Sequence, residues 1–278
     1  MIPRSWLYVP ADDAPRLAKA AGRGADALIV DLEDGVAPSA KDGARANLRD
    51  FLADAPPSTW VRVTSDPAGL EFDLASCLQH NLAGIVLAKT EDPDQVATVA
   101  QRLTELPGAL RGLMPLIETG RAVFTVADLA GVAGVTQLQV GEADLRADLG
   151  VTFGSEESEL LLVRQRVVIV SSALNLLPPV APVSVEFRDL DVFRASTEAL
   201  ARMGYVGRAC IHPAQIDIAH EVFTPTAEEI DAARRLIAAA DAAAAEGRGA
   251  FTDDSGRMVD EAVVRQARRI LARGATSG

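Results

Sequence analysis

Short hydrophobic runs alternate with longer amphipathic segments along the whole chain. Each run is short enough for one buried strand, and most runs begin one βα-repeat length after the previous one. Runs that are apolar on both faces are typical of parallel strands, which are covered by helices on each side. Eight strands, each followed by a helix, predict a closed (β/α)8 barrel, that is, an α/β TIM barrel. The runs are Trp6–Val9, Ala27–Val30, Trp60–Val63, Gly84–Leu87, Gly112–Ile117, Thr136–Val140, Val180–Val185 and Gly207–Ile211.

Helix start signals occupy the segments between the runs. Acids and a proline stand together at 12–15, and Asp92-Pro93 opens a helical stretch that extends to Leu106. The interval after the sixth run is the longest and leaves room for a loop and a long helix at 156–176. An open doubly wound sheet is the structural alternative, but the sequence contains no GxGxxG or GxxxxGK[ST] motif to support it.

The chain continues well past the last predicted strand. Residues 226–246 form a predicted Ala-rich helix that opens with Thr-Ala-Glu-Glu, a helix-capping sequence. Residues 249–260 are predicted to form a short hairpin or loop, and 261–273 a final helix. We therefore divide the chain into a barrel domain, residues 1–223, and a C-terminal helical extension, residues 224–278. The extension is expected to pack as a lid or arm on its own subunit or on a neighbouring one.

Composition narrows the class of protein. Hydrophobic residues make up 49% and aromatic residues only 4%, so the core is built from aliphatic side chains, as in buried parallel sheets. The net charge of −12 argues against a nucleic-acid partner. No stretch approaches the ~20 apolar residues of a membrane span, and the N-terminus lacks a signal-peptide layout. Cys77 and Cys210 are far apart, which predicts reduced thiols in a cytoplasmic protein.

Candidate catalytic residues lie where the predicted strands run into the following loops, the usual place in such barrels. Glu118 and Asp144 follow successive strands, and neighbouring strands lie about 5 Å apart. Two carboxylates so close repel each other unless a proton or a cation lies between them. Mg²⁺ suits the pair because it accepts one or two protein carboxylates and keeps its other positions for water and substrate. The alternative is that both are ordinary loop acids that cap the next helices.

Two further strand-end side chains bear on the chemistry. Arg62 ends the third predicted strand, and a guanidinium there can clamp a carboxylate through two hydrogen bonds. A cation together with this arginine would form a receptor for a 2-oxo acid. His212 precedes Pro213 at the end of the last strand, where it could face the barrel mouth or cap the next segment.

Several sequence blocks resemble the citrate lyase β-subunit-like proteins of the HpcH/HpaI aldolase superfamily, which also includes malyl-CoA and citramalyl-CoA lyases. The resemblance spans essentially the whole chain. The blocks are RSWLYVPADDAPRLAKAAGRGADALIVDLEDGVAPSAKDGAR at 4–45, LIETGRAV at 116–123, VGEADLRADLG at 140–150, GRACIHPAQI at 207–216 and GAFTDDSGRMVDEAVVRQA at 249–267. The chain departs from the commoner pattern at Ala11, Val63-Thr64, Ala88 and Ala143, which leaves the acyl group open.

The resemblance implies a site as well as a fold. Glu118 and Asp144 are the implied Mg²⁺ ligands, and Arg62 is the implied clamp on the oxo-acid carboxylate. Asp260 matches an aspartate that, in the coenzyme A lyases of this superfamily, reaches the active site of an adjacent subunit. A homo-trimer or hexamer is therefore the implied assembly.

The implied reaction is a retro-Claisen cleavage of a 3-hydroxyacyl-CoA, such as citryl-CoA, malyl-CoA or citramalyl-CoA. The products are a 2-oxo acid (oxaloacetate, glyoxylate or pyruvate) and an acyl-CoA. Asp260 is the candidate acid/base, and Arg62 holds the oxo acid in line. Two alternatives stay open: a class II aldolase acting on free oxo acids, and a β subunit of a multi-component citrate lyase that needs an acyl-carrier protein and an acyl-transferase.

Overall fold

A computed structural model describes residues 2–77, 82–104, 112–154, 157–184, 186–253 and 256–274. Pro3–His220 forms one compact unit, and the chain from Glu221 onward belongs to a second one. Parts of the predicted segments lie outside the described residues, namely Leu106, Glu156, Val185 and residues 254–255.

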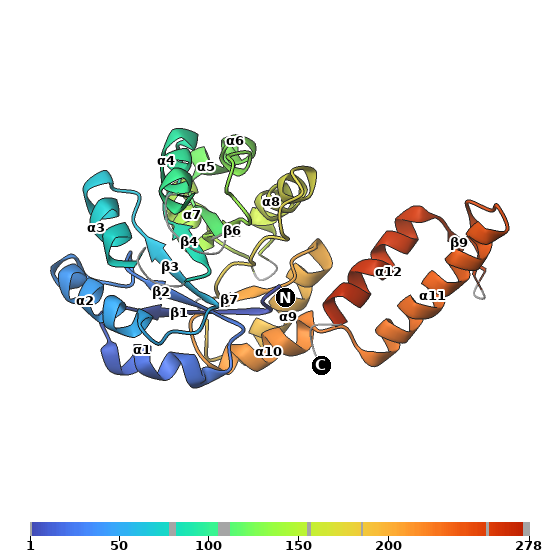
Figure 1. Cartoon of the computed structure of the whole chain (residues 1–278), viewed down its shortest axis with the longest axis horizontal. Helices are drawn as coiled ribbons and strands as arrows, with labels where there is room; N and C mark the ends of the chain where they lie inside the picture. Colours follow the sequence, from blue (N-terminus) through green and yellow to red (C-terminus); the bar gives the residue numbers. More distant parts are fainter. Residues whose placement is uncertain are drawn as a thin grey trace. The chain divides into compact units, whose positions relative to one another are not determined.

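The first unit is built around a curled parallel sheet (Figure 1). Its strand order is β6-β5-β4-β3-β2-β1-β7. Two isolated parallel bridges, Gln139 to Val180 and Ala181 to Arg208, fill the gap between β6 and β7. The ring therefore has eight positions, and the predicted (β/α)8 barrel is confirmed. The strands are β1 Ser5–Pro10, β2 Ala27–Asp31, β3 Thr59–Val63, β4 Gly84–Leu87, β5 Gly112–Ile117, β6 Gln139–Val140 and β7 Arg208–Cys210.

The seventh position of the ring is much shorter than the sequence pattern predicts. Only Val180 and Ala181 form bridges there: Val180 donates one backbone hydrogen bond to Leu138, and Ala181 donates one to Gly207 and accepts one from Ala209. Pro178 and Pro179 precede them and Pro182 follows. Proline lacks the N–H that a ladder needs, so pairing cannot extend in either direction.

Helices cover the outside of the barrel (Figure 1). The first of them begins as predicted, because the Asp13 side chain accepts a hydrogen bond from the Arg16 N–H, and Pro15 stands in the first turn. They are α1 Ala14–Ala20, α2 Lys41–Leu52, α3 Pro67–Cys77, α4 Pro93–Thr104, α5 Gly120–Phe124, α6 Val126–Ala130, α7 Glu142–Leu149, α8 Leu161–Ala173, α9 Leu190–Met203 and α10 Ala214–Phe223.

Aliphatic side chains and a tryptophan pair fill the core. Trp6 on β1 and Trp60 on β3 are buried and meet edge to face, with ring centroids 5.5 Å apart. A Cβ atom at Gly112 would lie 2.4 Å from the Trp60 ring. Glycine at the start of β5 is therefore required for the indole to fit.

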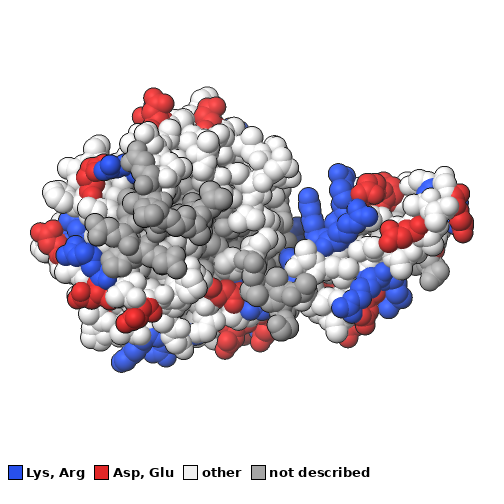
Figure 2. Space-filling model, viewed as in Figure 1, with Lys and Arg blue, Asp and Glu red and all other residues white. Residues whose placement is uncertain are grey.

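The second unit is a helical hairpin. Helix α11, Ala227–Ala245, begins with a capping box between Thr226 and Glu229, as its sequence predicts. Two short antiparallel strands, β8 Phe251–Thr252 and β9 Met258–Val259, lead into α12, Glu261–Gly274. Acidic and basic side chains lie close together on its surface (Figure 2). Among the helices of the described residues, none combines the length and apolar character needed to cross a bilayer.

Candidate active site

The loop after β2 fixes the arginine predicted to clamp the substrate. Asp31 and Arg62 lie opposite each other in the parallel register of β2 and β3. Arg62 donates two hydrogen bonds to the buried Asp31 carboxylate, from Nε to Oδ1 at 2.7 Å and from Nη2 to Oδ2 at 2.6 Å. Asp31 also accepts backbone N–H bonds from Glu33 and Gly35, which hold its carboxylate in place.

This arrangement limits how Arg62 can meet a substrate. Burial alone would lower the pKa of Arg62, but the hydrogen bonds and charge of Asp31 outweigh it and raise the pKa, so the guanidinium is charged. Its Nε–Nη2 edge is occupied by Asp31, and Nη1 lies 3.4 Å from Glu33. The edge that Asp31 does not occupy is the one formed by Nη1 and Nη2, and Glu33 lies beside it.

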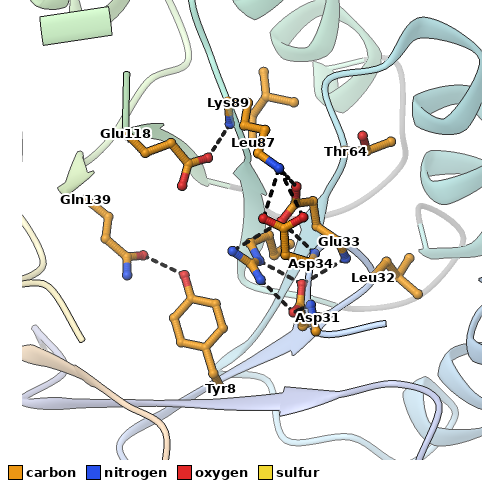
Figure 3. A network of polar contacts seen from close by, with 12 residues as sticks. Tyr8, Asp31, Leu32, Glu33, Asp34, Thr64, Leu87, Lys89, Glu118 and Gln139 are labelled. Carbon is orange, nitrogen blue, oxygen red and sulfur yellow. Dashed lines mark hydrogen bonds and ion pairs between the residues drawn. The ribbon is translucent and has the colours of Figure 1, made fainter. Parts of the chain in front are cut away.

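Lys89 follows β4 in an unusual backbone conformation. Its φ of 47° is in the left-handed region, which only glycine adopts without cost. In this conformation its backbone N–H points at Glu118 and donates to Oε1 at 2.5 Å. Its ammonium group contacts Glu33 at 2.7 Å and Asp34 at 2.9 Å (Figure 3). The acidic loop after β2 therefore contacts both cations of the site.

Glu118, at the end of β5, is almost completely buried, with 1% of its surface exposed. Burial raises the pKa of its carboxyl to about 8, the Lys89 N–H and Arg62 oppose this rise, and the charges of Asp144 and Glu33 add to it. Burial and the neighbouring negative charges disfavour the ionised form of this carboxyl. A cation bound beside it would stabilise the ionised form, so Glu118 is a good candidate metal ligand.

Asp144 lies in the first turn of α7 and close enough for its charge to act on Glu118. The chain between the two acids is tightly packed, because a Cβ atom at Gly141 would lie 2.5 Å from Oε2 of Glu118. Among the described residues no three acidic, histidine or cysteine side chains gather as a closed metal site. Two hard carboxylate ligands with open positions fit magnesium rather than structural zinc.

The Tyr8 hydroxyl projects from β1 into the same space as Glu118 (Figure 3). It donates to Oε1 of Gln139 at 3.0 Å, and the Tyr8 ring lies 5.2 Å below the Arg62 guanidinium carbon. Burial raises the pKa of Tyr8, so the phenol stays neutral. Tyr8 was not among the site residues predicted from the sequence. Strand alternation could have found it, since Tyr8 is two positions after the interior Trp6 and nearer the mouth.

A cavity of about 670 Å³ adjoins the site, between β1, α1 and the loop after β7. Tyr8 lines the cavity, together with three basic side chains of α1 and its end, Arg16, Lys19 and Arg23. His212 also lines it. Asp13 also lines the cavity and lies 3.3 Å from Arg16, so the lining has three basic side chains and one acidic one on a protein whose net charge is −12.

His212 caps the next segment, which is one of its two sequence-based alternatives. Its ring lines the cavity, and its Nδ1 accepts a hydrogen bond from the Ala214 N–H at 3.2 Å, at the start of α10. The ring also stacks on Phe187, with centroids 5.5 Å apart.

The remaining predicted site residue, Asp260, belongs to the second unit. It is exposed and caps α12, with Oδ1 accepting from the N–H groups of Ala262 and Val263 at 2.9 and 3.1 Å. The structure thus gathers Arg62, Glu118 and Asp144 at one barrel mouth, and the role of Asp260 stays a prediction.

The fold and the site define a (β/α)8-barrel enzyme with carboxylates and an arginine converging at the strand ends. Residues 4–213 match the HpcH/HpaI aldolase/citrate lyase family, and the chain belongs to this family. The resemblance found in the sequence is confirmed.

Relatives agree over nearly the full length. A citrate lyase subunit beta-like protein of Deinococcus radiodurans is 36% identical, over 97% of this chain and 96% of its own. The mitochondrial citramalyl-CoA lyase of Mus musculus is 34% identical, over 96% of this chain and 85% of its own. The crystal structure of CitE from Mycobacterium tuberculosis in complex with magnesium, acetoacetate and coenzyme A has a TM-score of 0.82 and 31% identity, covering 98% and 97% of the two chains.

Proposed function

We propose that this protein is a magnesium-dependent carbon–carbon lyase that cleaves or forms a 3-hydroxyacyl-CoA. The substrate class includes citryl-CoA, malyl-CoA and citramalyl-CoA, and the products are a 2-oxo acid and an acyl-CoA. The observation that carries the proposal is the convergence of Glu118 and Asp144 beside Arg62. Relatives named citramalyl-CoA lyase and citrate lyase subunit beta-like support the class. A related CitE structure in complex with oxaloacetate and magnesium supports the oxo acid and the metal.

Glu118 and Asp144 would hold the magnesium ion. The chemistry supplied by the bound ion is Lewis-acid polarisation of the substrate's hydroxyl and carboxylate oxygens. Arg62 offers its Nη1–Nη2 edge to the oxo-acid carboxylate, and Asp31 keeps that edge aimed at the mouth. The cleaved bond then lies between the oxo-acid carbon and the carbon next to the thioester.

The cavity lined by Tyr8 would take the thioester and its carrier. Arg16, Lys19 and Arg23 stand on its rim, where they attract the phosphates of coenzyme A. Tyr8 would lie between the thioester and Arg62, because it lines this cavity and its ring contacts the Arg62 guanidinium.

We further propose a homo-trimer or hexamer in which Asp260 serves the site of a neighbouring subunit. Its carboxylic acid form would donate a proton to the enolate left by the cleavage, and its carboxylate form would remove that proton in the condensation direction. A cytoplasmic location fits the two buried free thiols, Cys77 and Cys210.

The test uses the purified chain with citryl-CoA, malyl-CoA and citramalyl-CoA, in Mg²⁺ and in EDTA. We expect cleavage of at least one ester with Mg²⁺ and loss of cleavage with EDTA. Glu118→Gln and Asp144→Asn should abolish magnesium uptake in calorimetry, whereas Asp148→Asn, on the same helix, should retain it.

Other outcomes would identify the alternatives. Turnover of free hydroxy acids without coenzyme A would establish a class II aldolase. Activity that appears only with an acyl-carrier protein and an acyl-transferase would establish a β subunit of a multi-component lyase. Metal-independent cleavage would overturn the proposed chemistry.

A further inference from the structure

A buried ion pair lies directly behind the predicted metal ligands. Glu142, the first residue of α7, accepts two hydrogen bonds from Arg164 on α8, at 2.6 Å from Nε and 2.7 Å from Nη2. Both residues are almost fully buried, at 5% and 4% exposed. Arg164 Nη2 also contacts Glu157 at 2.8 Å, and the Tyr205 hydroxyl donates to the Arg164 carbonyl at 3.1 Å. The arginine is therefore held on several sides.

Stability alone does not account for such a pair. Removing two charges from water is costly, and well-packed apolar residues in their place are often equally stable. The cost is easier to explain if the pair fixes a geometry that the site needs. Burial would lower the pKa of Arg164, but the hydrogen bonds and charge of Glu142 outweigh it and raise the pKa, so the guanidinium is charged.

The pair lies at the start of α7, so the geometry that it fixes is the position of this turn beside Glu118. Glu142 directly follows Gly141, whose backbone packs against Glu118, and precedes Asp144 by two residues. The start of α7 thus packs against Glu118 and carries Asp144, the two predicted metal ligands. Between these two contacts, Glu142 bonds to Arg164.

The bidentate bond to Arg164 holds the first turn of α7 in place, because Glu142 cannot move without leaving a buried guanidinium unpaired. Asp144 lies two residues further along the same turn and is held with it.

We propose that Arg164, acting through Glu142, is a positioning residue for the magnesium site: it anchors the first turn of α7 so that Asp144 stays opposite Glu118. The inference rests on the proposed metal site. Loss of a partner behind a metal ligand typically weakens metal binding by about 10- to 100-fold.

The experiment titrates Mg²⁺ into the metal-free protein by calorimetry and measures thermal unfolding of the same samples. Arg164→Lys keeps the positive charge but cannot donate two parallel hydrogen bonds to the Glu142 carboxylate. We expect its Mg²⁺ affinity to fall about tenfold. The double variant Glu142→Leu/Arg164→Met removes both charges and should regain folding stability. Its Mg²⁺ affinity should nevertheless remain reduced, because the anchor is missing.

Arg208→Met is the matched control. Arg208 is equally buried, but it begins β7 and bonds carbonyl and hydroxyl oxygens of Pro182, Phe193, Ser196 and Thr197. This variant should lose stability and keep its Mg²⁺ affinity.

Three results would count against the inference. Wild-type affinity in both Arg164 variants would overturn it, and so would an equal loss of affinity in Arg208→Met. A wild-type protein that takes up no Mg²⁺ would overturn the metal site itself, which separates the failure of the proposed function from the failure of this anchor.

Discussion

Asp31 occupies one edge of the Arg62 guanidinium through two hydrogen bonds of 2.7 and 2.6 Å, so this arginine reaches the barrel mouth already oriented. We expect Asp31→Asn to lower kcat/KM by about 10- to 100-fold, mainly through KM, because a neutral amide can accept only one of these bonds. Steady-state kinetics on the thioester substrate measures the effect.

Asp26→Asn provides the comparison for that variant. Asp26 accepts a similar pair of bonds from Arg4, before the start of β1. The Asp26→Asn variant should have a free energy of unfolding lower by about 1–3 kcal/mol and an unchanged kcat/KM. Equal kinetic losses in both variants would mean that general loosening, rather than the orientation of Arg62, is responsible.

Gly141→Ala should weaken magnesium binding. The added methyl group would lie 2.5 Å from Oε2 of Glu118, so that carboxylate or the start of α7 must move. We expect a stability loss of about 1–3 kcal/mol together with reduced Mg²⁺ affinity in calorimetry. Gly43→Ala, in α2 with open space around it, should instead be neutral or stabilising. Unchanged Mg²⁺ uptake by Gly141→Ala would contradict the packing argument.

The cavity rim is testable through its charges. Replacing Lys19 and Arg23 by alanine should raise KM for a coenzyme A ester several-fold, more strongly at low salt, because screening weakens the phosphate contacts. Mg²⁺ affinity should not change. Arg49→Ala, an exposed arginine of α2, is the control that should leave KM unaltered. If KM in the double variant equals that of the wild type, the coenzyme binds elsewhere.

Stability should fall on mild acidification because of His220. Burial lowers the pKa of His220, while Asp26 and Asp217 raise it and Arg4 lowers it further. The unfolded chain therefore binds a proton at higher pH than the folded chain. The resulting stability is present above a pH of about 6.5 and declines as pH falls below that value. The Ser5 hydroxyl lies 2.8 Å from Nε2 of His220, and Oδ1 of Asp26 lies 3.2 Å from the same nitrogen.

His220→Gln tests this dependence. Urea unfolding at pH 7.5 and at pH 5.5 should show a smaller difference for the variant than for the wild type. The pKa of Asp26 is lowered by its bonds from Arg4 despite its burial, so its contribution is lost only at more acidic pH, below about 3.8. An unchanged slope between pH 7.5 and 5.5 would remove His220 as the cause.

Local patterns predicted most of this molecule. The eight hydrophobic runs give the barrel, and the strand-end rule selects Glu118, Asp144 and Arg62, because sequence order along a parallel barrel is also spatial order around its mouth. The length of the seventh strand was predicted wrongly as Val180–Val185, although the prolines beside Val180 and Ala181 already exclude a longer ladder.

Side-chain contacts between residues far apart in the sequence could not be predicted from the sequence. Arg62 was expected to clamp a substrate carboxylate, and the sequence did not indicate that Asp31 binds one edge of its guanidinium. The buried bond between Glu142 and Arg164 joins positions on two helices with no motif between them. Such contacts depend on side-chain direction and packing, which one sequence does not specify.

Asp260 permits a clean separation of catalysis from stability. Its carboxylate caps α12 through bonds to the N–H groups of Ala262 and Val263. Asparagine caps helices about as well as aspartate, so Asp260→Asn should keep the unfolding temperature, whereas Asp260→Ala should lower stability by about 1 kcal/mol. Neither variant can exchange a proton at this position, so both should lose kcat by about 10²- to 10⁴-fold and keep their Mg²⁺ affinity. Full activity of Asp260→Asn would assign the acid/base to another residue, and a loss confined to Asp260→Ala would reduce Asp260 to a structural cap.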